Sequence, residues 1–391
     1  MLPIQDIIEG ADRYVASLRE GESHQYRFSS IGEAGLISTC LAVIIKDLTG
    51  SIERLSDEER NGWIEYIQGF QDKETGLFHE PTDAGTNPYL RWSNCDYAIC
   101  ALQILNGRPI HPLKFLHELS DLKKLNAYLN EIDWSSAGLE SNFIMFLLDL
   151  LEYDKDTIDN YEEVLNTTFD YMNSKQDPVT GLWGMREGSY YCSGLAGAFH
   201  LVFFYSYYGR PLSYMEEMID SVLLCRYRKR FVFPEIWGHP CGDFDTIDLI
   251  VRLSRMTEYR KDELTSWMRD LYEGTITHRQ DDGGFNWVNF RFLSPLEIPL
   301  IIAQGFKQNT LKNKIKLPLR TCRDQLKFLI NKPVAYESIK DRAGTRLILT
   351  ESNIFATFMR LNSCLFLHKE LNPDTQLRFK RTLGLGWYGL S

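Results

Sequence analysis

Three aspartates stand close together in the segment WGHPCGDFDTIDL, residues 237–249. Asp245 and Asp248 are three residues apart, so on an α-helix they share one face, and Asp243 precedes them by two residues. Carboxylates at this spacing repel one another, and in a dry site one of them keeps its proton. A protonated carboxyl in an apolar chamber is a general acid. The structural alternative is that Asp243 caps the helix, Asp245 complements its dipole and Asp248 is solvated.

Aromatic side chains are abundant, with 20 Tyr, 22 Phe and 8 Trp. Many of them stand where apolar helices are expected to begin. One such residue usually packs in the core, whereas the excess as a whole favours an apolar pocket. The candidates for lining that pocket are Trp92, Tyr97, Tyr190, Tyr191, Trp237, Phe244 and Trp287.

The chain also has some of the residues that glycoside hydrolysis and zinc binding require. Glycoside hydrolysis requires two carboxylates on opposite faces of the substrate, and Asp245 with Glu140 or Asp96 would supply them. His239, Cys241 and Asp243 alternate, but a zinc site needs three or four protein ligands and the chain offers no convincing further one. We therefore expect no zinc.

A phrase made of Gln-Asp, a turn with glycine and an aromatic residue occurs three times, as IQGFQDKETGLF (67–78), MNSKQDPVTGLW (172–183) and THRQDDGGFNW (277–287). Its glutamines, Gln71, Gln176 and Gln280, are 105 and 104 residues apart, which indicates an internal repeat. The favoured interpretation is structural. Gln and Asp bond helix ends and turn amides, Gly adopts a positive φ, and the aromatic residue packs between hairpins.

Seven segments are apolar on nearly every face and are predicted to be buried helices: 31–45, 94–105, 139–151, 189–204, 243–256, 294–306 and 351–367. Amphipathic stretches such as 59–70 and 161–174 lie between them, and β-type alternation is scarce. We therefore predict an all-α chain. Alternation of the two kinds of helix indicates concentric layers of hairpins. The expected closure is a single α/α toroid of about six hairpins over residues 1–391, with segments 1–25 and 370–391 closing the ring and the inner helices pointing their N-terminal ends at a common mouth.

The repeated phrase resembles the glutamine and aromatic repeats of the squalene-cyclase and protein-prenyltransferase superfamily, whose members are α/α toroids. The resemblance in architecture covers residues 25–370, and its specific motifs are the three short repeats. QDPVTGLWG is also similar to wording in α/α-toroid glycan-processing enzymes such as unsaturated-uronide hydrolases. Protein prenyltransferases hold zinc through Asp, Cys and His, and the matching place here, SYYC (189–192), lacks the Asp. The repeats therefore indicate the fold more than the chemistry.

The acidic cluster resembles the DxDD motif of class II terpene cyclases, in which the middle Asp protonates an alkene or epoxide and starts a carbocation cascade. Asp243 matches the first position and Asp245 the proton donor, whereas Thr246 stands in place of the last Asp. The resemblance implies a terpene-cyclase-like enzyme in which Asp245 is the general acid, supported by Asp243, Thr246 and Asp248. A carbocation needs a dry chamber with π faces, which the aromatic candidates would provide.

This hypothesis implies a small hydrophobic substrate and no cofactor. If the substrate carries a diphosphate, Mg²⁺ would accompany it and basic groups such as Arg291 would line the mouth. Two alternatives stay open. A hydrolase, lyase or epimerase acting on a uronic-acid-containing saccharide predicts a wide polar groove, and a non-catalytic toroid that binds a protein partner predicts that the three aspartates face solvent.

The composition argues against some classes of binding partner. The chain has 43 Lys+Arg against 53 Asp+Glu, a net charge of −10, which argues against nucleic acid and anionic membranes. No stretch reaches the roughly 18 uninterrupted apolar residues of a membrane-spanning helix, and the N-terminus lacks a signal-peptide pattern. The eight cysteines are scattered, as is typical of reduced core thiols. We expect a cytoplasmic protein.

Overall fold

The structure is a computed structural model that describes residues 3–80, 87–189, 191–227, 240–288, 335–340, 346–348, 350–375 and 377. Within these residues the chain is mostly helical, which confirms the predicted all-α class. One short antiparallel pair of strands, β1 (Ala335–Lys340) and β2 (Arg346–Ile348), is not predicted by the sequence.

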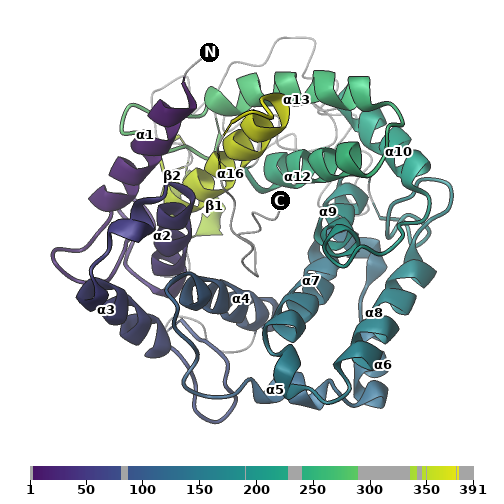
Figure 1. Cartoon of the computed structure of the whole chain (residues 1–391), viewed down its shortest axis with the longest axis horizontal. Helices are drawn as coiled ribbons and strands as arrows, with labels where there is room; N and C mark the ends of the chain where they lie inside the picture. The colour runs from purple at the N-terminus through teal and green to yellow at the C-terminus, as the bar shows by residue number, and fades with distance from the viewer. Residues whose placement is uncertain are drawn as a thin grey trace.

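Six helices contact one another in cyclic order around the centre of Figure 1. They are α2 (Leu36–Leu48), α4 (Pro88–Ile104), α7 (Ala137–Tyr153), α9 (Tyr191–Tyr207), α12 (Pro240–Met256) and α16 (Ile354–Leu371). Each contacts the next, and α16 returns to α2. Long runs of consecutive residues are buried in these helices, because other helices cover them on several sides. All six overlap predicted buried helices, and the seventh prediction, 294–306, lies outside the described residues.

The remaining helices of the described residues lie outside this ring in Figure 1. They are α1 (Ile4–Ser17), α3 (Asp57–Gln68), α5 (Lys114–Glu118), α6 (Leu122–Asn130), α8 (Tyr161–Lys175), α10 (Met215–Tyr227) and α13 (Lys261–Ile276), with 3₁₀ turns at Ser51–Arg54, Trp134–Ser136 and Lys155–Thr157. An outer helix buries one stripe: α3 buries only Trp63 and Ile67, which are four residues apart. Helix α1 contacts both α2 and α16, so it covers the place where the ring closes.

Two pairs of neighbouring inner helices run in the same direction. At the starts of α7 and α9, the Gly138 N–H donates to Ser193 Oγ at 2.9 Å. At the ends of α12 and α16, Arg255 Nε and Glu370 Oε2 form an ion pair of 2.8 Å. The N-terminal ends of α7 and α9 therefore lie on the same side of the ring as each other, and so do those of α12 and α16.

The first two of the repeated phrases form turns that tie neighbouring hairpins together. Gln71 Nε2 donates to a carbonyl of its own turn, Gly76 O, at 2.9 Å and to His111 O, beyond the next helix, at 2.8 Å. Gln176 Nε2 makes the corresponding bonds to its own turn and to Ser213 O, at 2.9 and 2.7 Å. These bonds support the structural interpretation of the phrase.

The glycine of each phrase has the predicted positive φ, +80° at Gly76, +69° at Gly181 and +92° at Gly283. A Cβ atom at Gly181 would also overlap backbone atoms of Tyr214 and Met218. Both the dihedral angle and the close approach therefore require glycine there.

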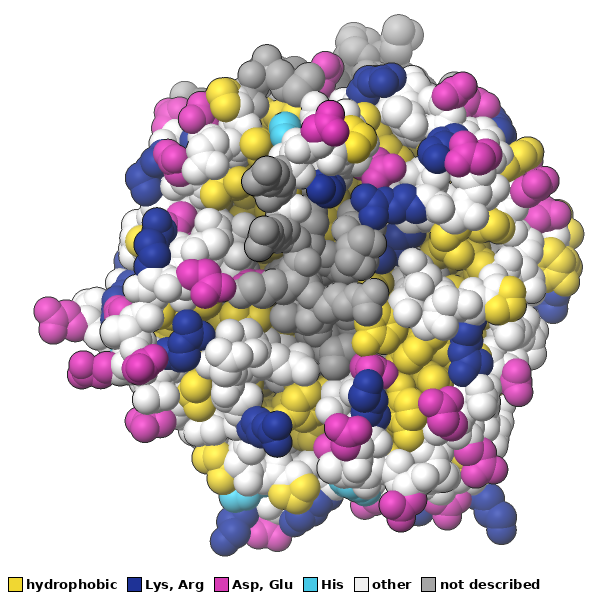
Figure 2. Space-filling model, viewed as in Figure 1, with side chains coloured by type: hydrophobic (Ala, Val, Ile, Leu, Met, Phe, Trp, Pro, Cys, Tyr) yellow, Lys and Arg dark blue, Asp and Glu magenta, His cyan; other side chains and the backbone are white. Residues whose placement is uncertain are grey.

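Charged side chains of both signs are mixed around the rim of the face that Figure 2 shows, with hydrophobic side chains between them in the lower half of the view. None of the helices in the described ranges combines the length and the apolar character needed to cross a bilayer.

Candidate active site

The three aspartates of the acidic cluster lie in the first half of α12, inside the ring. The helix begins at Pro240, a residue suited to a first helical position, so Asp243 lies within the first turn. The expectation that Asp243 caps the helix is therefore wrong. All three side chains are buried, including Asp248, so the structural alternative of a solvated Asp248 is also wrong.

Asp243 is held by an arginine of a different helix. Arg360 Nη1 on α16 donates to Asp243 Oδ2 at 3.1 Å. The same guanidinium donates from Nε to Asn286 O at 3.1 Å and from Nη2 to Trp287 O at 2.9 Å. Burial lowers the pKa of Arg360, and the charge of Asp243 opposes that shift. A buried cation with three acceptors is the arrangement that keeps both members of an ion pair charged.

Asp248 is held by an arginine one turn further along its own helix. Arg252 donates from Nε to Asp248 Oδ1 at 2.6 Å and from Nη2 to Oδ2 at 2.8 Å, which is the bidentate geometry of a strong ion pair. The guanidinium also lies over the ring of Phe203, 4.5 Å from its centroid. Burial raises the pKa of Asp248, and Arg252 opposes that shift.

Asp245 differs from both neighbours. Its side chain is 7% exposed, and among the described residues it forms no ion pair with Lys, Arg or His. Burial raises the pKa of Asp245 well above its ordinary value of 3.8, and the charges of Asp248 and then Asp243 raise it further. When the two neighbours are ionised by their arginines, Asp245 is the carboxyl of the cluster that holds a proton.

Thr246, which stands in place of the last aspartate of the motif, does not support Asp245 in the expected way. Its Oγ1 donates to Gly242 O of the same helix at 2.8 Å. A hydroxyl has one proton to donate, so this bond to the backbone leaves none for a neighbouring carboxyl.

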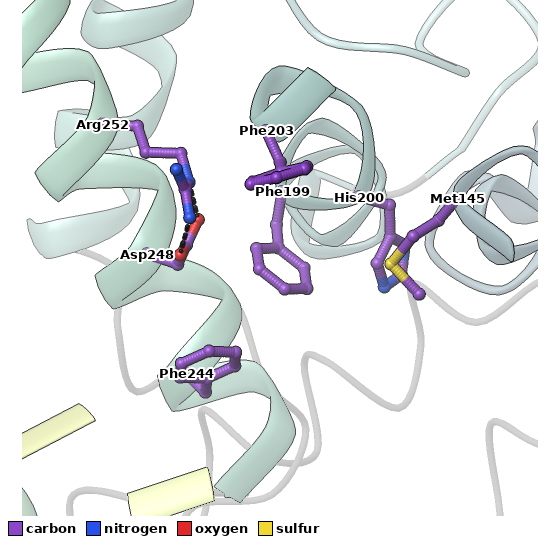
Figure 3. A pocket seen from close by; sticks show the side chains of 7 residues that line it. All are labelled: Met145, Phe199, His200, Phe203, Phe244, Asp248 and Arg252. Carbon is purple, nitrogen blue, oxygen red and sulfur yellow. Dashed lines mark hydrogen bonds and ion pairs between the residues drawn. The ribbon is translucent and has the colours of Figure 1, made fainter. Parts of the chain in front are cut away.

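A small cavity opens between α7, α9 and α12 beside this cluster (Figure 3). Three phenylalanines and a methionine form most of its wall, and its lining residues are Met145, Phe199, His200, Phe203, Phe244, Asp248 and Arg252. Its volume is about 10 Å³, close to the roughly 10–15 Å³ that one water molecule needs. Its wall is mostly apolar, but Asp248 and not Asp245 faces it, and an isoprenoid does not fit in it.

His200, on the wall of this cavity, forms a buried hydrogen-bonded pair with Ser141. Its Nδ1 lies 2.8 Å from Ser141 Oγ on α7. Burial lowers the pKa of His200 to about 3, so the ring is neutral at neutral pH. Sequence reasoning missed this pair, and the only signal was a histidine within an otherwise apolar stretch.

The predicted aromatic residues do not all meet at the cluster. Phe244 lines the cavity, and Trp287 stacks on Phe355 with 5.6 Å between ring centroids while its carbonyl accepts from Arg360. Trp92 packs instead against Phe115 and Tyr128 of the outer helices α5 and α6.

The structure does not place the other predicted site residues at the acidic cluster. Tyr97 is buried within α4. Tyr191 begins α9, but its side chain lies outside the described residues, as do Tyr190, Trp237 and Arg291. Arg252 and Arg360, which neutralise the cluster, were not among the predicted site residues.

In the described ranges, no three His, Cys, Asp or Glu side chains are placed to hold a metal ion. Disulfides do not join the cysteines whose side chains are described, which are Cys40, Cys95, Cys100, Cys241 and Cys364.

Comparisons with protein-family models, with curated proteins and with solved structures find no match to this chain. The resemblance to the squalene-cyclase and prenyltransferase superfamily therefore stays a prediction. The cyclic contacts of the inner helices describe the architecture alone.

Proposed function

We propose that the protein is an enzyme in which Asp245 acts as a general acid. One observation carries this proposal: three buried aspartates share the first half of α12, and the described residues neutralise Asp243 and Asp248 with arginines but leave Asp245 without a cation. A carboxyl that keeps its proton at neutral pH is able to deliver it to a weakly basic substrate.

The substrate that suits such an acid is an apolar isoprenoid. Transfer of the Asp245 proton to an alkene carbon forms a C–H bond from the π electron pair, and leaves a carbocation and an Asp245 carboxylate. Ring closure and loss of a proton from the last cation then give an isomer of the substrate. The surrounding apolar residues favour this chemistry because water would quench the cation.

The substrate would contact Asp245 and not occupy the cavity of Figure 3, whose volume of about 10 Å³ admits one water molecule. Burial of the three aspartates is not what the non-catalytic alternative expects. The glycan-active alternative stays open, because a protonated carboxyl is also the general acid of a glycosidase.

The test is turnover of a substrate panel in D₂O. The panel contains squalene-type polyenes, isoprenyl diphosphates with and without Mg²⁺, and unsaturated uronic-acid oligosaccharides. We expect a cyclised isoprenoid that carries one solvent-derived deuterium at the carbon that was protonated. The variant Asp245→Asn, which has the same shape but no acidic proton, should lose about 100-fold or more of this turnover.

The matched control is Asp177→Asn. Asp177 is also buried, 8% exposed, but it lies in the turn of the second repeat, where its Oδ1 accepts from Val179 N at 2.7 Å. Asparagine keeps that acceptor, so turnover should stay at the wild-type level. Isoprenoid turnover by Asp245→Asn at the wild-type rate would refute the proposal, and cleavage of the oligosaccharide alone would favour the glycan-active alternative.

A further inference from the structure

Arg360 is an unusual residue for its position. It lies in the middle of α16 between Met359 and Leu361, and its side chain is 0% exposed. Placing a guanidinium in such an interior is costly unless every donor direction is satisfied. Here it binds one carboxylate and two backbone carbonyls, and the carboxylate, Asp243, is 117 residues away in the sequence.

We infer that Arg360 is a positioning residue, which fixes Asp243 as a carboxylate and thereby makes Asp245 the aspartate of the cluster that carries the proton. This inference rests on the function proposed above. It adds a residue that does not need to contact the substrate and yet decides which carboxyl is the acid.

The charged and titratable groups around the cluster support this assignment. From α12 they are Cys241, Asp243, Asp245, Asp248 and Arg252, from α16 Arg360 and Cys364, and from α9 His200. His200 is neutral because of its burial, and burial also raises the pKa of Cys364 to about 12. Among the described residues, the charges that act on Asp245 are therefore those of its two acidic neighbours and, through them, of the two arginines.

Removal of the Arg360 charge has a definite consequence. Asp243 would then lose the guanidinium charge that favours its carboxylate form, so it would take up a proton more readily. A neutral Asp243 no longer repels the charge of Asp245, so Asp245 would release its proton at a lower pH. The proton would be shared between two carboxyls, and the acid would no longer be a single residue.

A purely structural role predicts a different result. Arg360 also ties Asn286 and Trp287 to α16 through their carbonyls. If that were its whole role, its loss would change the free energy of unfolding but not the number of carboxyls that hold protons at neutral pH. The carboxyl titration of the folded protein separates the two roles.

The experiment is ¹³C NMR of the full chain labelled at the aspartate carboxyl carbons, followed over pH. The signal that disappears in Asp245→Asn identifies Asp245. In the wild type we expect the Asp245 midpoint to be the highest of the cluster and Asp243 to be ionised at neutral pH. In Arg360→Met we expect the Asp243 midpoint to rise and the Asp245 midpoint to fall by about one unit or more. Arg360→Lys, which keeps the charge, should restore the wild-type pattern.

Asp243→Asn provides the test if Arg360→Met does not fold. Its amide oxygen still accepts from Arg360 but carries no charge, so the Asp245 midpoint should again fall. If Asp245 titrates as in the wild type in this variant or in folded Arg360→Met, the inference is wrong while the proposed function stands. If the wild type has no high-pKa signal that Asp245→Asn removes, the proposed function itself fails.

Discussion

Asp243, Asp245 and Asp248 have the same side chain and nearly the same burial, and their different chemistry comes from what lies beside each. Two have an arginine at 3.1 Å or less, and the third is repelled by both neighbours. Because the folded protein disfavours the ionised form of Asp245, its ionisation at higher pH lowers the free energy of unfolding.

The variant Asp245→Asn should therefore become more stable than the wild type as pH rises. The pKa of Asp245 is raised on folding, so its contribution to stability is fully present below the ordinary value of 3.8 and is lost as pH rises towards the folded value. Asparagine does not titrate. We expect the difference in unfolding free energy, measured by urea denaturation, to grow in favour of the variant above pH 3.8. A difference that is constant with pH would contradict a raised pKa.

The Asp248–Arg252 pair should behave as a unit. Arg252→Met leaves a buried carboxylate alone, which should reduce the unfolding free energy by about 3–5 kcal/mol. The double variant Asp248→Leu/Arg252→Met removes both charges and should recover most of that loss. A double variant as unstable as the single one would show that the packing of Arg252 on Phe203, and not the charge pairing, is what stabilises the site.

Sequence reasoning found the acidic cluster but not the residues that neutralise it. Arg252 was within reach, because an arginine four residues after Asp248 on an apolar helix predicts an i,i+4 pair. Arg360 interrupts an apolar helix, and a charge there must be paired. Its partner was not predictable, since no local pattern links residues 117 positions apart.

At the scale of elements, the helices follow from local patterns. Apolar residues on nearly all faces predicted the six described inner helices, and one apolar stripe predicted the outer helices α3 and α8. Burial on one or several sides leaves that pattern in the sequence. The β1–β2 pair was missed, and the start of α12 was placed too late because Pro240 was not considered as its first residue.

The turn of the second repeat allows a controlled test of its glycine. Gly181→Ala combines a positive φ of +69° with overlap of the backbone of Tyr214 and Met218, whereas Gly209 has a φ of +61° and no atom within 4 Å of the position that a Cβ would occupy. Gly209→Ala should cost about 1–2 kcal/mol of unfolding free energy from the dihedral angle alone. Gly181→Ala should cost clearly more, as measured by denaturant titration. Equal losses would show that the turn is free to move away from Tyr214.

At the scale of the whole molecule, the two layers were predicted from the alternation of helix types, and the cyclic contacts of the inner helices agree with that prediction. The pairing of α16 with α2 depends on the closure of the ring, which is a property of the complete set of helices. Helix α1 packs on both of them and buries Ile7 completely.

The variant Ile7→Ala should therefore loosen the closure of the ring. We expect a loss of about 2–5 kcal/mol of unfolding free energy and faster amide hydrogen exchange in α2 and α16 as well as in α1. Ile110→Ala, at a side chain that is 61% exposed, should change the unfolding free energy by no more than about 0.5 kcal/mol. It should leave the amide exchange rates of these helices unchanged. Faster exchange confined to α1 would mean that this helix is not part of the closure.

The most direct test of the acid role of Asp245 is neutron diffraction from crystals of the wild-type protein grown in D₂O near neutral pD, because it locates individual protons. We predict a deuteron on a carboxyl oxygen of Asp245, fully deuterated guanidinium groups on Arg252 and Arg360, and no deuteron on Asp243 or Asp248. A deprotonated Asp245, or a deuteron on either neighbour instead, would contradict the account.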